Sequence, residues 1–162
     1  MSMLARYRKP GGINQLISLL ESCLSKKREA LLSTIQAEDK EFAALVRSKL
    51  LSVEKIFQWD PLLVSEATTR MAERTLAVAL KGMPPEAFEI ATHTMRDLKK
   101  REVMNFLETV KPSPVEIESA HIKLVETVRG LEKDGTLRLD DNGTPTANMV
   151  GSAPAAPMKK AA

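Results

Sequence analysis

Few residues of this sequence are suited to covalent or metal chemistry. It contains a single cysteine, Cys23, and two histidines, His93 and His121. A hydrolase or transferase needs a nucleophile beside a base that orients it, and a zinc site needs ligands at spacings such as His-x-x-x-His or Cys-x-x-Cys. Neither pattern occurs in the sequence. We therefore predict that the protein is not an enzyme and that it holds no cofactor and no metal.

The surroundings of Cys23 and His121 favour structural roles. Cys23 lies within three residues of apolar helix positions, and free cysteine is among the most often buried residue types. We interpret it as a buried or half-buried structural thiol rather than a nucleophile. His121 falls on the apolar face of an expected helix, which favours a packed histidine over a catalytic one.

Charge balance and apolar run length argue against two classes of partner, nucleic acid and membrane. Basic residues at positions 6–9 account for the formal net charge of +3, and the rest of the chain carries basic and acidic residues in equal number. A folded part that is neutral on average does not describe a nucleic-acid surface. No apolar run approaches the ~20 residues that span a membrane, and a single cysteine suits a reducing compartment. We predict a cytoplasmic protein without nucleic-acid binding or direct membrane insertion.

A short basic cluster stands out in the second half of the chain. It consists of Lys99, Lys100 and Arg101, on an expected helix. Two interpretations stay open for it. It is a solvated helix face, or it is a charged docking face for an acidic partner.

The apolar residues recur at helical spacing. Hydrophobic content is 43% but aromatic content only 4%, which favours helix over strand because straight-chain side chains lose little rotamer freedom in a helix. Ser25 is predicted to cap a second helix and Asp39 a third. The apolar face of the first helix is formed by Ile13, Leu16, Ile17, Leu20 and Leu24.

The later helices carry clearer start and stop signals. Asp60-Pro61 predicts an N-cap followed by proline at the first helical position. A further helix is expected over about residues 73–81, and Gly82 is expected to end it in the left-handed conformation. The segment from Ser113 to Glu116 (Ser-Pro-Val-Glu) predicts a capping box at the start of a long helix, about 114–134. No segment alternates strictly enough to be a strand, so the predicted fold class is all-α.

Five short segments carry a resemblance to a known family. They are Gly11-Gly12-Ile13, Asp39-Lys40-Glu41-Phe42-Ala43, Val53-Glu54-Lys55-Ile56, Leu76 to Gly82 (Leu-Ala-Val-Ala-Leu-Lys-Gly), and Ser113 to Glu116 followed later by Gly135-Thr136-Leu137. The family patterns that they match are a Gly-Gly linker, DPELA, FEDL, LALALKG and SDVE…GEI. On these segments the chain resembles the bacterial flagellar motor switch protein FliG, from the end of its middle repeat through its C-terminal domain.

The resemblance implies an architecture in which a short armadillo-like helical repeat precedes a helical C-terminal domain closed by the long helix. We expect a flexible basic lead-in over residues 1–12 and a three-helix armadillo-like segment over 13–52. A C-terminal-type helical domain is expected over 53–139, followed by a disordered Ala/Pro tail over 140–162.

The resemblance also implies a function. Members of the family are peripheral rotor components at the cytoplasmic base of the flagellum, which transmit torque from the stator and take part in switching the direction of rotation. The implied partners are the stator, neighbouring switch subunits, and further copies through the helical repeats. Lys81 matches the lysine of ALKG, a stator-facing charge, and the family's MFVF-type hinge falls on Leu50, Leu51, Ser52 and Val53.

Departures from the family pattern keep a second hypothesis open. In the segment that corresponds to the torque helix, Asn105 and Phe106 stand where the family has adjacent acids, and Leu98 stands where it has an arginine. The family's anchoring N-terminal region has no counterpart in the sequence. The alternative is a family-derived helical adaptor protein that binds another partner without contacting the stator.

Overall fold

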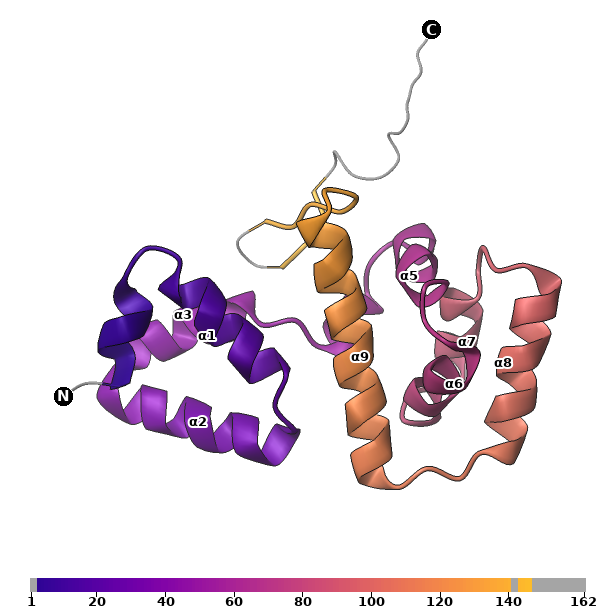
Figure 1. The fold of residues 1–162 in the computed structure, drawn as a ribbon, viewed down its shortest axis with the longest axis horizontal. Coiled ribbons are helices and arrows are strands. Elements are labelled where there is room, and N and C mark those ends of the chain that lie inside the picture. Colours follow the sequence, from indigo (N-terminus) through magenta and orange to yellow (C-terminus); the bar gives the residue numbers. More distant parts are fainter. Residues whose placement is uncertain (1–2, 141–142, 147–162) are drawn as a thin grey trace, which may run out of the picture.

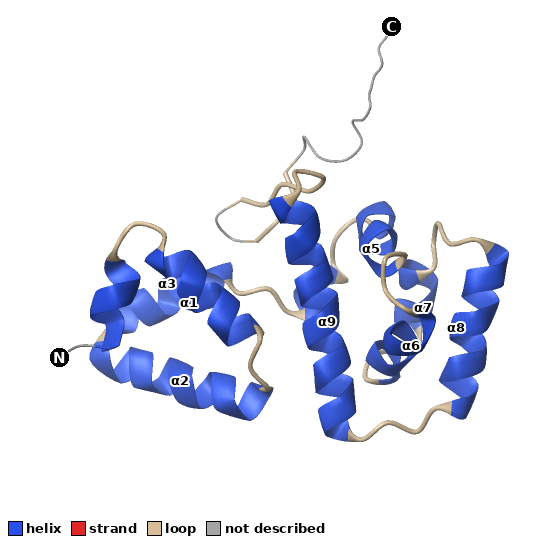
Figure 2. Cartoon of the chain, viewed as in Figure 1, coloured by secondary structure: helices blue, strands red, loops and turns tan. Residues whose placement is uncertain are grey.

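The structure, a computed structural model, describes residues 3–140 and 143–146, and this part of the chain is helical (Figure 1, Figure 2). Within these residues, the pairing of extended segments is limited to an isolated antiparallel bridge between Leu139 and Pro145. The all-α prediction is therefore confirmed. None of the described helices has the length and apolar content needed to cross a membrane. The elements are η1 (Met3–Arg8), α1 (Gly12–Glu21), α2 (Ser25–Glu38), α3 (Lys40–Lys49), α4 (Val53–Ile56), α5 (Pro61–Thr68), α6 (Glu73–Lys81), α7 (Glu86–Ala91), α8 (Asp97–Thr109) and α9 (Pro114–Lys133).

The elements from η1 to α3 pack together, and we call them the N-terminal unit. Helices this short are not stable alone in water, so each depends on the apolar faces of its neighbours. Asp39 caps α3 as predicted, because its carboxylate accepts a hydrogen bond from the amide of Phe42 at 3.1 Å. The buried core of the unit is made by Leu4, Leu16, Ile17, Leu20, Leu32, Ile35, Ala43 and Val46.

The structure corrects the expectation of a flexible lead-in over residues 1–12. Residues Met3–Arg8 form the 3-10 helix η1, whose Leu4 side chain is fully buried in the core of the N-terminal unit. The guanidinium of Arg8 lies 2.6 Å from the Asp39 carboxylate at the start of α3. The expectation followed the basic charge and the Pro-Gly-Gly run, and it overlooked the one leucine that anchors the segment.

The helices from α4 to α9 form a second unit, the C-terminal unit, arranged around α6. Every residue from Leu76 to Leu80 is buried, so α6 is covered on all sides. The helices α8 and α9 pack against it, and α9 also contacts α1, α4 and α5. In Figure 1, α9 therefore stands between the N-terminal unit and the other helices of the C-terminal unit.

The longest helix, α9, begins with the predicted capping box. The hydroxyl of Ser113 accepts a hydrogen bond from the Glu116 amide at 3.2 Å, and the Glu116 carboxylate accepts one from the Ser113 amide at 3.0 Å. The helix ends at Lys133, close to the expected position. Gly135 follows it with a φ of +86°, a left-handed conformation that glycine adopts without steric cost.

Three local predictions were wrong. Gly82 does not adopt the left-handed conformation, since its φ is −93°. Its role is close packing, because a Cβ there would lie 2.5 Å from Cγ2 of Ile117 on α9. Ser25 does not cap α2, because it is itself the first residue of that helix. The start of α2 is instead capped by a residue of another helix, as described below. Leu24 lies beyond the end of α1 and is 37% exposed.

The tail that was expected to be disordered, residues 140–162, lies mostly outside the described residues. Its described part turns back on the segment after α9. The amide of Thr146 donates to the carbonyl of Arg138 at 2.9 Å, and the amide of Asp140 donates to the carbonyl of Thr144 at 2.8 Å. The expectation of disorder therefore does not hold for residues 143–146.

Candidate functional site

The expected hinge, Leu50 to Val53, lies at the junction of the two units. Leu50 ends α3 in an extended conformation and packs against the core of the N-terminal unit. Leu51 and Val53 are buried in the core of the C-terminal unit. Ser52 caps α4 by accepting a hydrogen bond from the Lys55 amide at 3.2 Å. The boundary between the two cores therefore falls between Leu50 and Leu51.

A buried carboxylate binds the backbone of this segment, Leu50 to Val53, which we call the connector. Glu21, the last residue of α1, is only 6% exposed. Its Oε2 atom accepts a hydrogen bond from the Leu51 amide at 2.9 Å. A buried carboxylate in an apolar environment is costly unless its oxygens are paired, so its other partners decide whether it is tolerated.

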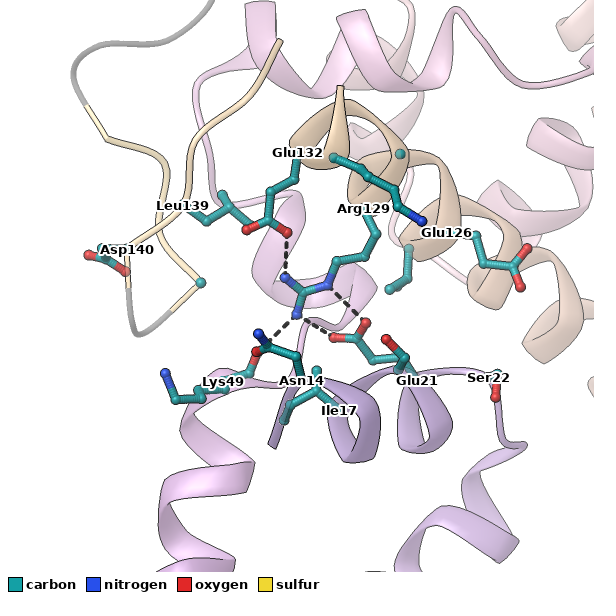
Figure 3. A pocket seen from close by; sticks show the side chains of 15 residues that line it. Asn14, Ile17, Glu21, Ser22, Lys49, Glu126, Arg129, Glu132, Leu139 and Asp140 are labelled. Atoms are coloured by element: carbon teal, nitrogen blue, oxygen red, sulfur yellow. Dashed lines mark hydrogen bonds and ion pairs between the residues drawn. The ribbon is translucent and has the colours of Figure 1, made fainter. Parts of the chain in front are cut away.

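Those partners come from Arg129 on α9. Its Nε donates to Oε1 of Glu21 at 2.9 Å and its Nη2 donates to Oε2 at 2.6 Å, which is the bidentate geometry that suits an arginine and a carboxylate. Nη2 also donates to the carbonyl of Lys49, the last residue of α3, at 3.1 Å. Nη1 donates to Glu132 at 2.8 Å. Figure 3 shows Arg129 reaching from α9 toward Glu21 on α1, with Glu132 on its other side.

The electrostatics of this cluster are favourable. Burial opposes the charge of the Arg129 guanidinium, but the hydrogen bonds and the attraction of Glu21 and then of Glu132 outweigh it, so the pKa of Arg129 is raised above its usual value. Removing one partner of a buried ion pair typically costs about 3–5 kcal/mol, because the other charge is left buried and unpaired. Arg129 is partly exposed, which brings the cost at this site toward the lower end.

An open cleft of about 750 Å³ borders the cluster. Its walls come from α1, the end of α3, α9 and the segment after α9, and they carry polar and charged side chains, among them Asn14, Lys49 and Glu126 (Figure 3). Among the described residues, no group of His, Cys, Asp or Glu side chains is placed to hold a metal ion.

A second polar contact joins the two units. The amide and hydroxyl of Ser25 donate to Oε1 of Glu118 on α9, at 2.9 and 3.0 Å. The bond from the Ser25 amide, and then that from its hydroxyl, lowers the pKa of Glu118 below its usual value. Glu118 therefore fills the role at the start of α2 that the sequence assigned to Ser25.

The expected stator-facing charge, Lys81, is exposed at the last residue of α6. The basic cluster on α8 lies elsewhere. Its first member, Lys99, is 4.0 Å from Glu73, the first residue of α6. The structure therefore places Lys81 at the end of α6, whereas Lys99, on α8, lies beside the start of α6, so the two lysines are not together.

The three residues of the basic cluster have different surroundings. The ammonium of Lys99 donates to the carbonyl of Thr69 at 2.6 Å and to that of Met71 at 2.9 Å, so it is engaged within the chain. Lys100 lies over the ring of Phe88, 5.9 Å from its centroid. Arg101 is exposed. The cluster is thus not one uniform solvated face.

Cys23 and His121 are packed, as predicted. Cys23 is buried, and its thiol donates to the carbonyl of Leu19 at 3.2 Å. The Nε2 atom of half-buried His121 lies 2.8 Å from the carbonyl oxygen of Ala79. Glu118 and His121 have the Glu-x-x-His spacing of some metal sites. Their described contacts are structural, with Ser25 and Ala79.

The sequence comparisons decide the family. Residues 33–139 match the family described as FliG C-terminal domain. The chain belongs to this family. The match begins within α2 and extends past the end of α9, so it includes the connector, Arg129 and two of its partners, Lys49 and Glu132, but not Glu21.

Curated relatives within the FliG family are similar over most of this chain. The flagellar motor switch protein FliG of Borreliella burgdorferi is 22% identical over 85% of the chain and 40% of the relative. That of Thermotoga maritima is 23% identical over 85% and 41%, and that of Aquifex aeolicus is 28% identical over 76% and 38%. The chain thus spans about two fifths of the length of these relatives.

Solved FliG structures have the same fold. A crystal structure of FliG residues 86–343 from H. pylori has a TM-score of 0.58 at 18% identity, covering 78% of this chain and 60% of that chain. A second, which starts at residue 116, has a TM-score of 0.51 and covers 80% and 58%. This likeness concerns the fold alone.

Sequence reasoning missed Glu21 and Arg129, the residues that join the two units of this FliG-family chain. One signal was available for Glu21. It lies four residues after Ile17, on the apolar face of α1, where a carboxylate would be buried and would need a partner. No local pattern identified Arg129 as that partner, because the two are 108 positions apart.

Proposed function

We propose that this chain is a non-enzymatic rotor and switch component of the flagellar motor, which transmits torque from the stator and takes part in switching the direction of rotation. The single observation that carries this proposal is the match of residues 33–139 to the FliG C-terminal domain. Its place would be peripheral, at the cytoplasmic side of the flagellar basal body. Its partners would be the stator, neighbouring switch subunits and, through the helical repeats, further copies of itself.

The geometry supports this role in two ways. Packed helices transmit a push without deforming, because protein interiors are close-packed. The connector from Leu50 to Val53 lies between two separate cores, where a change of orientation requires few torsions to turn. A rotor part that is pushed and that changes orientation needs both features.

The push itself requires charge rather than bond-making. Complementary charges on a stator and a rotor helix interact over about one Debye length, ~8–10 Å at physiological salt. Exposed Lys81 is the stator-facing charge that we propose. From the basic cluster, Lys100 and Arg101 remain as docking charges, since Lys99 is bound to carbonyls within the chain.

The test combines localisation with motility. In the source organism, a tagged chain should form foci at flagellar bases, and Lys81→Glu should slow or stop swimming. Lys26→Glu, a charge reversal at an exposed position of α2 in the N-terminal unit, serves as the matched control and should swim normally. Circular dichroism of both purified variants should show unchanged helix content. Diffuse fluorescence together with normal swimming of Lys81→Glu would contradict the proposal.

One observation favours the adaptor alternative. The exposed surface of α8 carries Asn105 at a position where the family has an acid, and Lys99 is engaged within the chain, so this helix presents fewer free charges than a torque helix. If the chain is an adaptor, affinity capture should recover a partner other than stator and switch subunits, and deleting the chain should leave motor rotation intact.

A further inference from the structure

The hydrophobic cores of the two units are separate, and hydrogen bonds of Glu21, Arg129 and Glu118 join the units. Eight buried apolar residues between Leu4 and Val46 form the cluster of the N-terminal unit, whereas Leu51 belongs to the main cluster of the C-terminal unit, and no buried residue is shared between these two clusters. Reorienting two units costs less when their buried cores are not continuous than when they share one core. The relative orientation of the units therefore depends strongly on the polar contacts that join them.

The cluster around Glu21 is the contact that spans the connector. Glu21 binds the amide of Leu51, just after the boundary between the cores. Arg129 binds the carbonyl of Lys49, just before that boundary. The two side chains bind each other. A turn of the backbone at Leu50 or Leu51 must break this set of bonds.

We propose that Glu21 and Arg129 form a latch that holds the two units in one orientation, and that its opening frees the connector from Leu50 to Val53 to turn. The effect of the latch on the direction of rotation rests on the proposed function. The latch itself is a property of the chain alone.

The latch is built so that it can open. Glu132 lies one turn along α9 from Arg129, and its carboxylate accepts a hydrogen bond from Nη1 of Arg129 at 2.8 Å. When Glu21 withdraws, the guanidinium keeps this partner within its own helix. Glu21 then faces the open cleft beside it, where water can solvate the carboxylate. Neither charge is left buried and unpaired, which lowers the cost of the open state.

The test measures the distance between the units in the purified full chain by double electron–electron resonance. Spin labels are attached at Ser33→Cys on α2 and Asn105→Cys on α8, both exposed positions, in a Cys23→Ala background. The test variant is Arg129→Met, which keeps the length of the side chain and removes its donors. Arg70→Met is the matched control, because the Arg70–Glu66 pair lies entirely within the C-terminal unit.

The parent and Arg70→Met should give one narrow distance. Arg129→Met should add a second distance whose population exceeds about 10%, the upper range for a minor conformer. If circular dichroism shows that Arg129→Met does not fold, Arg129→Lys is used instead, because lysine keeps the charge but cannot make the bidentate contact. Arg129→Lys should show the same second distance at a lower population. A parent-like distribution in the folded variants would overturn the latch.

Motility separates this inference from the proposed function. If Arg129→Met opens the units in the purified chain and the cells switch direction at an altered frequency, both proposals are supported. If the units open and switching is unchanged, the latch stands and the switching role is contradicted. If the distance is unchanged, the latch is overturned whatever the cells do.

Discussion

The carboxylate of Glu118 on α9 caps the N-terminus of α2 through the amide and the hydroxyl of Ser25, 93 positions away in the sequence. The first amides of a helix lack partners within the helix, and a negative charge at this end is stabilised by the helix dipole. Because the cap comes from the C-terminal unit, α2 gains this stabilisation only while the two units are in contact. The stability of the N-terminal unit is thus coupled to its docking.

We expect Glu118→Gln to destabilise the chain at pH 7. The amide oxygen can accept only neutral hydrogen bonds, so the charge-assisted part of the cap is lost. Because Glu118 is close to solvent, the expected loss is modest, about 1 kcal/mol or less. Urea unfolding followed by circular dichroism measures it. Glu126→Gln, at an exposed position of α9, is the control and should change the stability by less than about 0.5 kcal/mol.

The stability difference between the parent chain and Glu118→Gln is expected to depend on pH. The pKa of Glu118 is lowered from its usual 4.5, first by the Ser25 amide and then by the Ser25 hydroxyl. A folded-state pKa below the unfolded value contributes stability above the unfolded pKa, and this contribution is lost as the pH falls through the folded pKa. The difference between the parent and Glu118→Gln should therefore shrink below pH 4.5. A difference that stays constant through the acidic series would contradict the cap.

Much of the fold was predictable because its signals are local. The capping box of Ser113 and Glu116 lies within one turn, and Asp39 caps the helix that directly follows it, so both could be found from spacing alone. The contact between Glu21 and Arg129 could not be predicted in this way, because the two residues meet only after both units have folded. For the same reason Ser25 was assigned the cap that Glu118 provides: a distant carboxylate has no sequence signal at the helix that it caps.

Gly82 shows how a local rule can mislead about the reason for a residue. A glycine after a helix suggests a left-handed end, but the φ of Gly82 is one that any residue can adopt. The glycine is explained by the approach of α9, where Ile117 and His121 lie against the end of α6. This contact is invisible in the sequence, because it depends on how α6 and α9 pack.

Alanine substitution at two glycines tests this explanation. Gly82→Ala places a Cβ 2.5 Å from Ile117 Cγ2, so the Ile117 side chain or α9 must shift, and we expect a loss of about 1–3 kcal/mol from overpacking. Gly130→Ala meets nothing within 4 Å and lies inside α9, so it should stabilise the chain by about 0.5–1 kcal/mol. Thermal and urea unfolding of the two variants measure the opposite signs.

A double variant identifies the neighbour that causes the loss. Ile117→Ala removes Cγ2, the atom that the new Cβ would meet. The combined Gly82→Ala and Ile117→Ala variant should therefore be more stable than the sum of the two single effects predicts, by roughly 0.5–3 kcal/mol of coupling. Additive effects would mean that Gly82 is required for another reason.

The basic cluster offers a test that separates a structural lysine from a docking charge. Lys99→Met removes the donor to the carbonyls of Thr69 and Met71, and we expect it to cost about 1 kcal/mol of stability, since these carbonyls follow the end of α5 and lose a charge-assisted bond. Arg101→Met removes an exposed charge and should alter stability by less than about 0.5 kcal/mol. If the charges of α8 serve docking, Arg101→Glu should nevertheless impair swimming more than the Lys26→Glu control. Equal stability of Lys99→Met and the parent would show that Lys99 is a free surface charge after all, and the docking face would then regain it.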